Sequence, residues 1–231
     1  MKELNKAIDS LKNGKMILLY DADNREGETD FVIPARSTTP RDVAQMRKDG
    51  GGLICVAISA PVAKKLGLPF MSDLLKHAGN NGNKELATIV EKDGDIKYDH
   101  RSSFSIWVNH RDTCTGIPDN DRALTINRIA EVTKLVEDGG YIDFGSQFRC
   151  PGHVAILRAA DKLLEERAGQ TELSIALAQL AGITSAMVVC EMLDEEDGRA
   201  LSKQKARQYA KKHNFPFIEG KDVNNSHESC N

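Results

Sequence analysis

Residues 16–30 read MILLYDADNREGETD, an apolar run that passes directly into ten residues with five carboxylates and one arginine. The apolar part predicts a buried strand. If the chain stays extended from Glu26 onward, the side chains of Glu26, Glu28 and Asp30 project from one face. Carboxylates on one face repel each other unless a cation or an arginine lies among them. Two interpretations remain: a site for a hard cation such as Mg²⁺, or a polar hairpin edge held by surface ion pairs.

Apolar runs outside this stretch indicate the fold class. The runs GLICVAIS (52–59), GHVAILRA (152–159) and SAMVVCEML (185–193) alternate with helical patterns. Strands without a polar face must be covered on both sides, which predicts helices on both faces of a sheet. The pattern weakens over residues 72–103, where glycine and asparagine at 79–83 predict a loop. No linker divides the chain, so we predict a single domain over residues 1–220 and a polar, disordered tail over residues 221–231.

The composition is ordinary for a globular protein: 231 residues, 40% hydrophobic and 28% charged, with a net charge of −3. Without a basic surface, we expect neither nucleic acid nor an anionic membrane as a partner. No segment is long and apolar enough to cross a bilayer, and the five cysteines form no CxxC pair. These features predict a protein of the reducing cytoplasm.

Three further motifs carry candidate functional groups. RAGQTE (167–172) combines an arginine, a glycine turn and a helix start, which suits a phosphate, although an ordinary helix capped by Thr171 has the same pattern. In CPGHV, His153 either moves protons near neutral pH or only caps a strand. In VVCEM, Glu191 ends a core strand and either serves a site or marks the turn to the surface. Cys55 is most simply a small core residue.

Several of these stretches occur together in an order that is typical of one family. DADNREGETDFVIPA, GGLICVAIS, TGIPDNDRALTI, RCPGHVAILRA, RAGQTE and CEM resemble 3,4-dihydroxy-2-butanone-4-phosphate synthase of riboflavin biosynthesis, most of all its stand-alone archaeal type. The resemblance extends from the first strand to about Asn214 and implies the α+β class, with a three-layer α/β/α sandwich around a mixed twisted sheet. It also implies a lyase that converts D-ribulose 5-phosphate to formate and 3,4-dihydroxy-2-butanone 4-phosphate through a metal-stabilised enediol.

The resemblance also implies a cofactor, an assembly and residue roles. These are Mg²⁺, with Mn²⁺ as an alternative and two ions per site, and a cytoplasmic homodimer with active sites near the subunit interface. The metal positions fall on Glu26 and Gln170, and the catalytic positions on Asp21, Glu28, His153 and Glu191. The substrate-binding positions fall on Arg25, Glu26, Asp30, Cys55, Thr115, Arg167, Ala168, Gly169, Gln170, Thr171 and Glu191.

Gln170 departs from the family pattern, which reads Gly-His-Thr-Glu where this chain reads GQTE. In the family that histidine is the second protein ligand of the metal. An amide oxygen suits Mg²⁺, whereas an imidazole suits softer transition metals. Our hypothesis is that Gln170 still binds the metal, directly or through water, and shifts its preference toward Mg²⁺. The rival is a weakened second metal site with low activity.

Three other functions share parts of this pattern. A Mg²⁺-dependent isomerase or lyase acting on another sugar phosphate would use the same acids and phosphate turn. A nucleotide- or RNA-binding module is a non-catalytic alternative, which the acidic site and the absence of a basic stripe disfavour. A relic that binds sugar phosphate without turnover is the third, and Gln170 is the reason to consider it.

Overall fold

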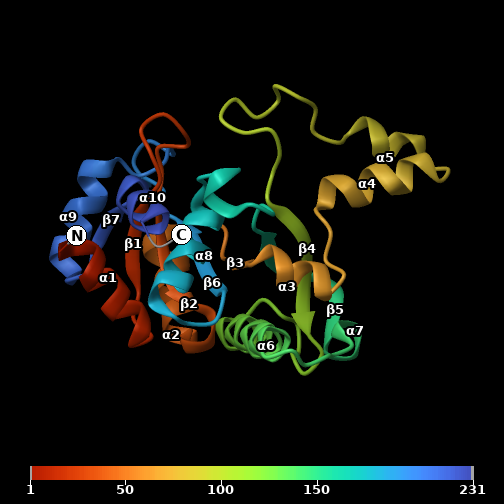
Figure 1. Ribbon diagram of the computed structural model, residues 1–231, viewed down its shortest axis with the longest axis horizontal. Coiled ribbons are helices and arrows are strands. Elements are labelled where there is room, and N and C mark those ends of the chain that lie inside the picture. Colours follow the sequence, from red (N-terminus) through yellow and green to blue (C-terminus); the bar gives the residue numbers. More distant parts are fainter. Residues whose placement is uncertain (1, 230–231) are drawn as a thin grey trace.

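The structure is a computed structural model and describes residues 2–229. Within that range the strands form one seven-stranded sheet in the order β4-β5-β3-β6-β2-β1-β7 (Figure 1). The pairs β1–β7 and β3–β5 are parallel and the other neighbours are antiparallel, so the predicted mixed sheet is confirmed. The strands are β1 (Ile17–Tyr20), β2 (Thr29–Pro34), β3 (Cys55–Ile58), β4 (Phe104–His110), β5 (Phe148–Arg158), β6 (Ala186–Glu191) and β7 (Phe217–Glu219).

Helices cover both faces of this sheet, as the apolar strands require. On one face, Val56 and Val188 belong to a core with residues of α2, α3, α6 and α9. On the other face, Cys55 and Val189 pack with α1, α8 and α10. The predicted three-layer sandwich is therefore confirmed. The α-helices are α1 (Lys2–Lys12), α2 (Pro40–Gln45), α3 (Ala60–Lys65), α4 (Met71–Asn80), α5 (Lys84–Thr88), α6 (Asp119–Glu137), α7 (Phe144–Gln147), α8 (Gln170–Ala181), α9 (Lys203–His213) and α10 (Gly220–Glu228).

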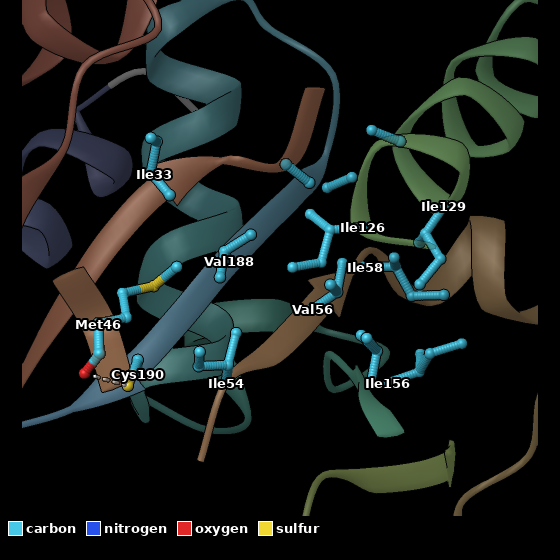
Figure 2. Close-up of a cluster of buried hydrophobic side chains, with 14 of the residues drawn as sticks. Ile33, Met46, Ile54, Val56, Ile58, Ile126, Ile129, Ile156, Val188 and Cys190 are labelled. Atoms are coloured by element: carbon cyan, nitrogen blue, oxygen red, sulfur yellow. Dashed lines mark hydrogen bonds between the residues drawn. The ribbon is translucent and has the colours of Figure 1, made fainter. Parts of the chain in front are cut away.

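Figure 2 shows the first of these cores, where α6 lies on the sheet. Ile126 and Ile129 are three residues apart and so share one face of α6. They lie against strand residues such as Val56 and Ile156, and all four side chains are at most 1% exposed. Burying a side chain of this size stabilises the fold by roughly 1.5–3 kcal/mol. This packing fixes the sheet whose strand ends carry the acidic residues.

The acidic stretch forms a turn, so the condition of an extended chain from Glu26 onward is not met. Residues 23–26 form the turn, Gly27 has a positive φ of 69°, and β2 begins only at Thr29. Strands β1 and β2 then pair as an antiparallel hairpin, with Tyr20 opposite Thr29. A positive φ costs glycine little, which allows the acidic residues to fold back over the end of β1.

Residues 72–103 contain two helices that the sequence pattern does not reveal. Gly79 and Asn80, which we predicted in a loop, lie in the last turn of α4. A Cβ atom on Gly79 would lie 2.5 Å from the Cβ of Ala87 in α5. This glycine therefore permits close packing of two helices, and the loop prediction is wrong at this point. In Figure 1 the α4–α5 pair projects away from the body of the molecule.

The segment after residue 220 is also helical, which corrects the prediction of a disordered tail. Helix α10 begins at Gly220, and Val223 is fully buried in the core that α8 shares with the sheet. One apolar residue in a polar stretch is too weak a signal to predict a helix. Residues 230–231 lie outside the described residues. Within residues 2–229, no helix has the length and apolar character needed to cross a membrane.

Candidate active site

Five carboxylates line a cavity of about 200 Å³ at one end of the sheet. Four of them are Glu26 and Glu28 from the turn, Asp30 from β2 and Glu191 from the end of β6, and the fifth is Asp99, which precedes β4. Asp30 and Glu191 are direct partners in the antiparallel pairing of β2 with β6, so the register itself brings the two acids together. The predicted convergence of the acidic residues is therefore correct, although strand register and a turn produce it.

The Asp21 side chain stabilises this turn through hydrogen bonds to its backbone. Its Oδ2 accepts a hydrogen bond from the Glu26 backbone N–H and its Oδ1 accepts one from the Glu28 N–H, both at 3.0 Å. The residue is 2% exposed and is not among those that line the cavity. Because both oxygens hold backbone groups, Asp21 positions Glu26 and Glu28. Its expected catalytic role stays a prediction.

Burial in the cavity raises the pKa of three carboxyl groups, those of Glu26, Glu28 and Asp30. Burial raises the pKa of Glu28 to about 7, with further contributions from the charges of Glu26 and Glu191. Burial and the Glu191 charge raise the pKa of the fully buried Asp30 well above its usual range. Burial also raises the pKa of Glu26, against the opposing effect of Arg167. The site therefore favours either bound protons or a bound cation.

The raised pKa of Glu28 predicts a pH-dependent stability. Since the folded-state pKa lies above the unfolded value, the contribution of Glu28 is fully present below about pH 4.5 and is lost as the pH rises through about 7. In the absence of divalent cations, we expect the melting temperature of the wild type to fall by a few degrees more than that of Glu28→Gln over this range. Calorimetric scans of both proteins check this; parallel pH curves would contradict it.

Gly52 makes room for Glu191. The Oε2 atom of Glu191 accepts a hydrogen bond from the Leu53 N–H at 2.8 Å, which fixes the carboxylate against the chain entering β3. A Cβ atom on Gly52 would lie 2.6 Å from the Glu191 carbonyl oxygen and would overlap its carboxylate. The catalytic position predicted for Glu191 thus depends on a glycine that sequence reasoning did not single out.

The variant Gly52→Ala should therefore lose both stability and activity. We expect a destabilisation of about 1–3 kcal/mol from overpacking, and a displaced Glu191 carboxylate. Urea unfolding measures the first effect and turnover of the folded protein the second. Gly145→Ala is a matched control, because its Cβ would only reach ordinary contact, 3.4 Å from Asp143. Equal behaviour of the two variants would contradict the argument.

The start of α8 supplies the other wall. The helix N-cap is Gly169, without a side-chain cap, so Thr171 is not the N-cap and instead lines the cavity. Gln170 is 6% exposed, and its Nε2 donates to the carbonyl oxygens of Leu19 at 3.2 Å and Glu28 at 3.1 Å. These two bonds fix the amide, and its buried Oε1 has no hydrogen-bond partner. A buried oxygen without a partner is costly unless a ligand meets it.

Two arginines meet on one carboxylate that the sequence did not point to. Arg25 Nη2 donates to Asp99 Oδ2 at 2.8 Å, and Arg167 Nε donates to the same oxygen at 2.5 Å. Asp99 and Tyr98 come from residues 89–103, between α5 and β4, and Tyr98 hydrogen-bonds Glu26. Neither residue lies in a motif, so no sequence signal distinguishes them. Sequence reasoning missed both.

The substrate-binding residues divide between two cavities. Arg25 and Ala168 line an outer cavity of about 790 Å³, and Arg167 lines both the outer and the inner one. Cys55 lines the inner cavity, and burial raises the pKa of its thiol well above the usual range, so the thiol stays protonated. Gly169 places Arg167, because a Cβ there would meet the guanidinium.

His153 and Thr115 do not line the inner cavity. Both are exposed and lie near each other at the β4–β5 pair, where Asn109 contacts both. The Asn109 side chain accepts from the His153 backbone N–H at 2.8 Å and lies 3.1 Å from the ring Nδ1. Within one chain, His153 and Thr115 therefore lie outside the cavity that Glu26 lines. Their expected roles in catalysis and substrate binding stay predictions, and the resemblance implies active sites near a subunit interface.

The donor groups of the inner cavity fit a hard cation. Glu26 supplies a carboxylate and Gln170 an unpaired amide oxygen. Among residues 2–229, no group of three or more histidine, cysteine or acidic side chains is arranged to hold a metal by itself. A cation here would need the amide oxygen, water or substrate oxygens to complete its shell, which is how Mg²⁺ is usually bound.

Helices on both faces of a mixed sheet, with acids and a helix start gathered at the strand ends, define an enzyme of the α+β class. The chain belongs to the 3,4-dihydroxy-2-butanone 4-phosphate synthase family, whose model matches residues 5–226. It is 60% identical over 222 residues to the synthase of Methanosarcina acetivorans, covering 96% of this chain and 90% of the relative. With the synthase of Archaeoglobus fulgidus it shares 56% identity, covering 96% and 92%. The predicted family, a lyase of riboflavin biosynthesis, is confirmed.

Solved structures agree with the fold. A 3,4-dihydroxy-2-butanone 4-phosphate synthase in complex with two magnesium ions superimposes with a TM-score of 0.74 at 26% identity, covering 95% of this chain and 94% of the other. The magnesium ions belong to that protein.

Proposed function

We propose that the chain converts D-ribulose 5-phosphate to formate and 3,4-dihydroxy-2-butanone 4-phosphate. The observation that carries this proposal is the inner cavity, which is lined by Glu26, Glu28, Asp30, Glu191 and by Gln170, whose buried Oε1 has no hydrogen-bond partner. Acids of raised pKa beside a cation position suit the removal of a proton next to a ketone, which gives an enediol. Family membership supports the same reaction.

The side chains have distinct tasks in this proposal. Glu28, with a pKa of about 7, can take and return a proton near neutral pH. Glu191 is held by the Leu53 N–H and serves as a second proton-transfer group. Asp30 hydrogen-bonds substrate hydroxyls from the buried floor of the cavity, and its Oδ1 has no other partner. Cys55 remains a neutral thiol and shapes the wall.

Glu26 and Gln170 would hold Mg²⁺, with Mn²⁺ as an alternative and two ions per site. The ions would lower the cost of negative charge on the sugar oxygens during proton removal. Their charge also relieves the repulsion among the four carboxylates. Tyr98 donates to Glu26 and so orients the carboxylate for this task.

The phosphate group of the substrate anchors it in the site. Arg25, Arg167 and the backbone N–H groups at the start of α8, including that of Thr171, offer a cationic cradle for it. Binding energy gained there positions the reacting end of the sugar among the acids. Glu172 holds Arg167 from behind at 2.5 Å, with no exposure to solvent.

We further propose a cytoplasmic homodimer. His153 and Thr115 are exposed and absent from the inner cavity, although both occupy family positions for catalysis or substrate binding. A second copy can supply both to the cavity of the first. The described cysteines Cys55, Cys114, Cys150 and Cys190 are free, as suits a reducing compartment.

Proton NMR of the purified chain with ribulose 5-phosphate and Mg²⁺ tests the reaction. We expect a formate singlet that grows as the substrate disappears. Substrate consumed without formate would indicate another sugar-phosphate isomerase or lyase. Substrate left intact with Mg²⁺, Mn²⁺ and Zn²⁺ would indicate a protein that only binds it.

Mixing two inactive variants tests the homodimer. If His153 acts on the partner's cavity, unfolding and refolding Glu26→Gln together with His153→Ala restores activity to about a quarter of the wild type, by random pairing of subunits. Each variant refolded alone is the control. Failure to regain activity in the mixture would place His153 and Glu26 in the same subunit's site.

A further inference from the structure

The loop between α5 and β4 reaches into the site from outside the motifs (Figure 1). Its base is closed by Glu91, whose two carboxylate oxygens accept from the Ser102 N–H at 3.0 and 3.1 Å. Its tip carries Tyr98 and Asp99, which contact the candidate metal ligand Glu26 and the two arginines. The position of the loop tip is therefore fixed by its contacts with Glu26, Arg25 and Arg167.

Asp99 bridges two arginines that are almost removed from water. The side chains of Arg25 and Arg167 are each 13% exposed and that of Asp99 is 11% exposed. A single carboxylate oxygen accepts from both guanidinium groups, at 2.8 and 2.5 Å. Hydrogen bonds between charged groups that are shielded from water are strong. Removing Asp99 without a replacement anion would leave two nearly buried guanidinium groups short of a partner, which costs free energy.

Arg167 has a second carboxylate partner that differs from Asp99. Glu172 lies within α8, is fully buried, and accepts from Arg167 Nη1 with one oxygen and from the Ala160 N–H with the other. Helix and backbone hold Glu172 in place. Asp99 belongs to a loop, so it is the partner that can be exchanged.

The Asp99 carboxylate also stands between the two cavities. Tyr98, Asp99 and Arg167 line both the inner cavity of about 200 Å³ and the outer one of about 790 Å³. Arg25 and Ala168 face the outer one. An anion that approaches the arginines from the outer cavity meets Asp99 already in place.

We propose that Asp99 is an internal anion that occupies the phosphate position between Arg25 and Arg167, and that a substrate phosphate displaces it. This inference rests on the proposed function for its phosphate handle. A phosphate dianion brings more charge and more acceptor oxygens than one carboxylate, so it can replace Asp99 on both guanidiniums. Asp99 thereby lowers the affinity for every phosphate and rejects weaker anions.

Asp99 acts through the arginines and is a positioning residue. If it only held them in place, its removal would weaken phosphate binding, because the guanidiniums would lose their orientation. If it competes, its removal strengthens binding, because the phosphate no longer displaces an ion pair. The two roles therefore predict opposite signs.

Isothermal titration of the full chain with inorganic phosphate measures that sign. We expect Asp99→Asn to bind phosphate about tenfold more tightly than the wild type, since one charged hydrogen-bond partner no longer competes. Asp95→Asn is the matched control: it removes the same charge from the same loop, is exposed, lines neither cavity, and its amide oxygen can keep the hydrogen bond from the Lys92 N–H. Unchanged or weaker binding by Asp99→Asn, with Asp95→Asn like the wild type, overturns the inference.

Two further measurements keep the outcome clear. The first is hydrogen exchange of the wild type, in which saturating phosphate should speed amide exchange at Tyr98 and Asp99 several-fold because the loop tip is released. Slower or unchanged exchange contradicts displacement. This test does not depend on the folding of any variant. Arg167→Gln separates the two proposals. If Arg167→Gln binds phosphate as tightly as the wild type, the proposed phosphate site itself is contradicted. If Arg167→Gln loses phosphate binding but Asp99→Asn does not bind more tightly, only the proposed role of Asp99 is contradicted.

Discussion

We expect Glu26→Gln to release formate from ribulose 5-phosphate, the proposed substrate, roughly a thousandfold more slowly than the wild type, the loss expected when a site loses a key electrostatic group. Glu26 lines the inner cavity, accepts from Tyr98 and lies 4.0 Å from Arg167. Glutamine keeps the shape and removes the charge that would hold a cation.

The formate singlet in proton NMR gives the rate, and Mn²⁺ binding followed by electron paramagnetic resonance gives the cation affinity. Glu85→Gln is the matched control, since Glu85 is exposed on α5 and does not line the inner cavity. Circular dichroism checks that both variants fold. Near-normal turnover by Glu26→Gln would refute a metal role for this residue.

We expect Gln170→His to shift the metal preference toward Zn²⁺ and Co²⁺ over Mg²⁺ by at least about tenfold, because an imidazole nitrogen favours softer metals than an amide oxygen does. In the wild type the amide is fixed by Leu19 O and Glu28 O, with Oε1 left for a ligand. The present residue therefore suits a hard cation. This is the hypothesis under which Gln170 replaces the family histidine as a working ligand.

Competition titrations of Mg²⁺ against Zn²⁺ without substrate measure this preference directly and do not depend on turnover. Gln204→His is the control, since it adds a histidine to the exposed face of α9. If Gln170→His behaves as Gln204→His does, Gln170 does not bind the metal. A large gain in activity with every metal would instead favour the rival view, a weakened site in the wild type.

Much of the inner cavity could be predicted because its residues lie in short motifs. Glu26 and Glu28 are two residues apart, and Asp30 is the second residue of β2, where it pairs with Glu191. The family resemblance assigned these acids, and the register of β2 and β6 brings them together. The layers of the fold followed from strands that are apolar on both faces.

Other features had no local signal. Asp99 lies 74 residues from Arg25 and 68 from Arg167 in the sequence. The three side chains meet only because the loop before β4 folds over the two arginines. Gly79 reads as a loop residue, whereas its lack of a side chain serves the packing of α4 on α5. Val223 stands alone among polar residues, yet the core of α8 buries it.

The amino-acid sequence by itself determined the family, the sheet covered on both faces, and the set of acids that can bind a cation, because periodicity and short motifs are local properties. Only the tertiary structure decided that Asp21 serves the turn, that His153 lies outside the inner cavity, and that Asp99 holds two arginines. Those outcomes depend on strand register, on loop paths and on which groups lose contact with water. These are set by contacts between residues far apart in the chain.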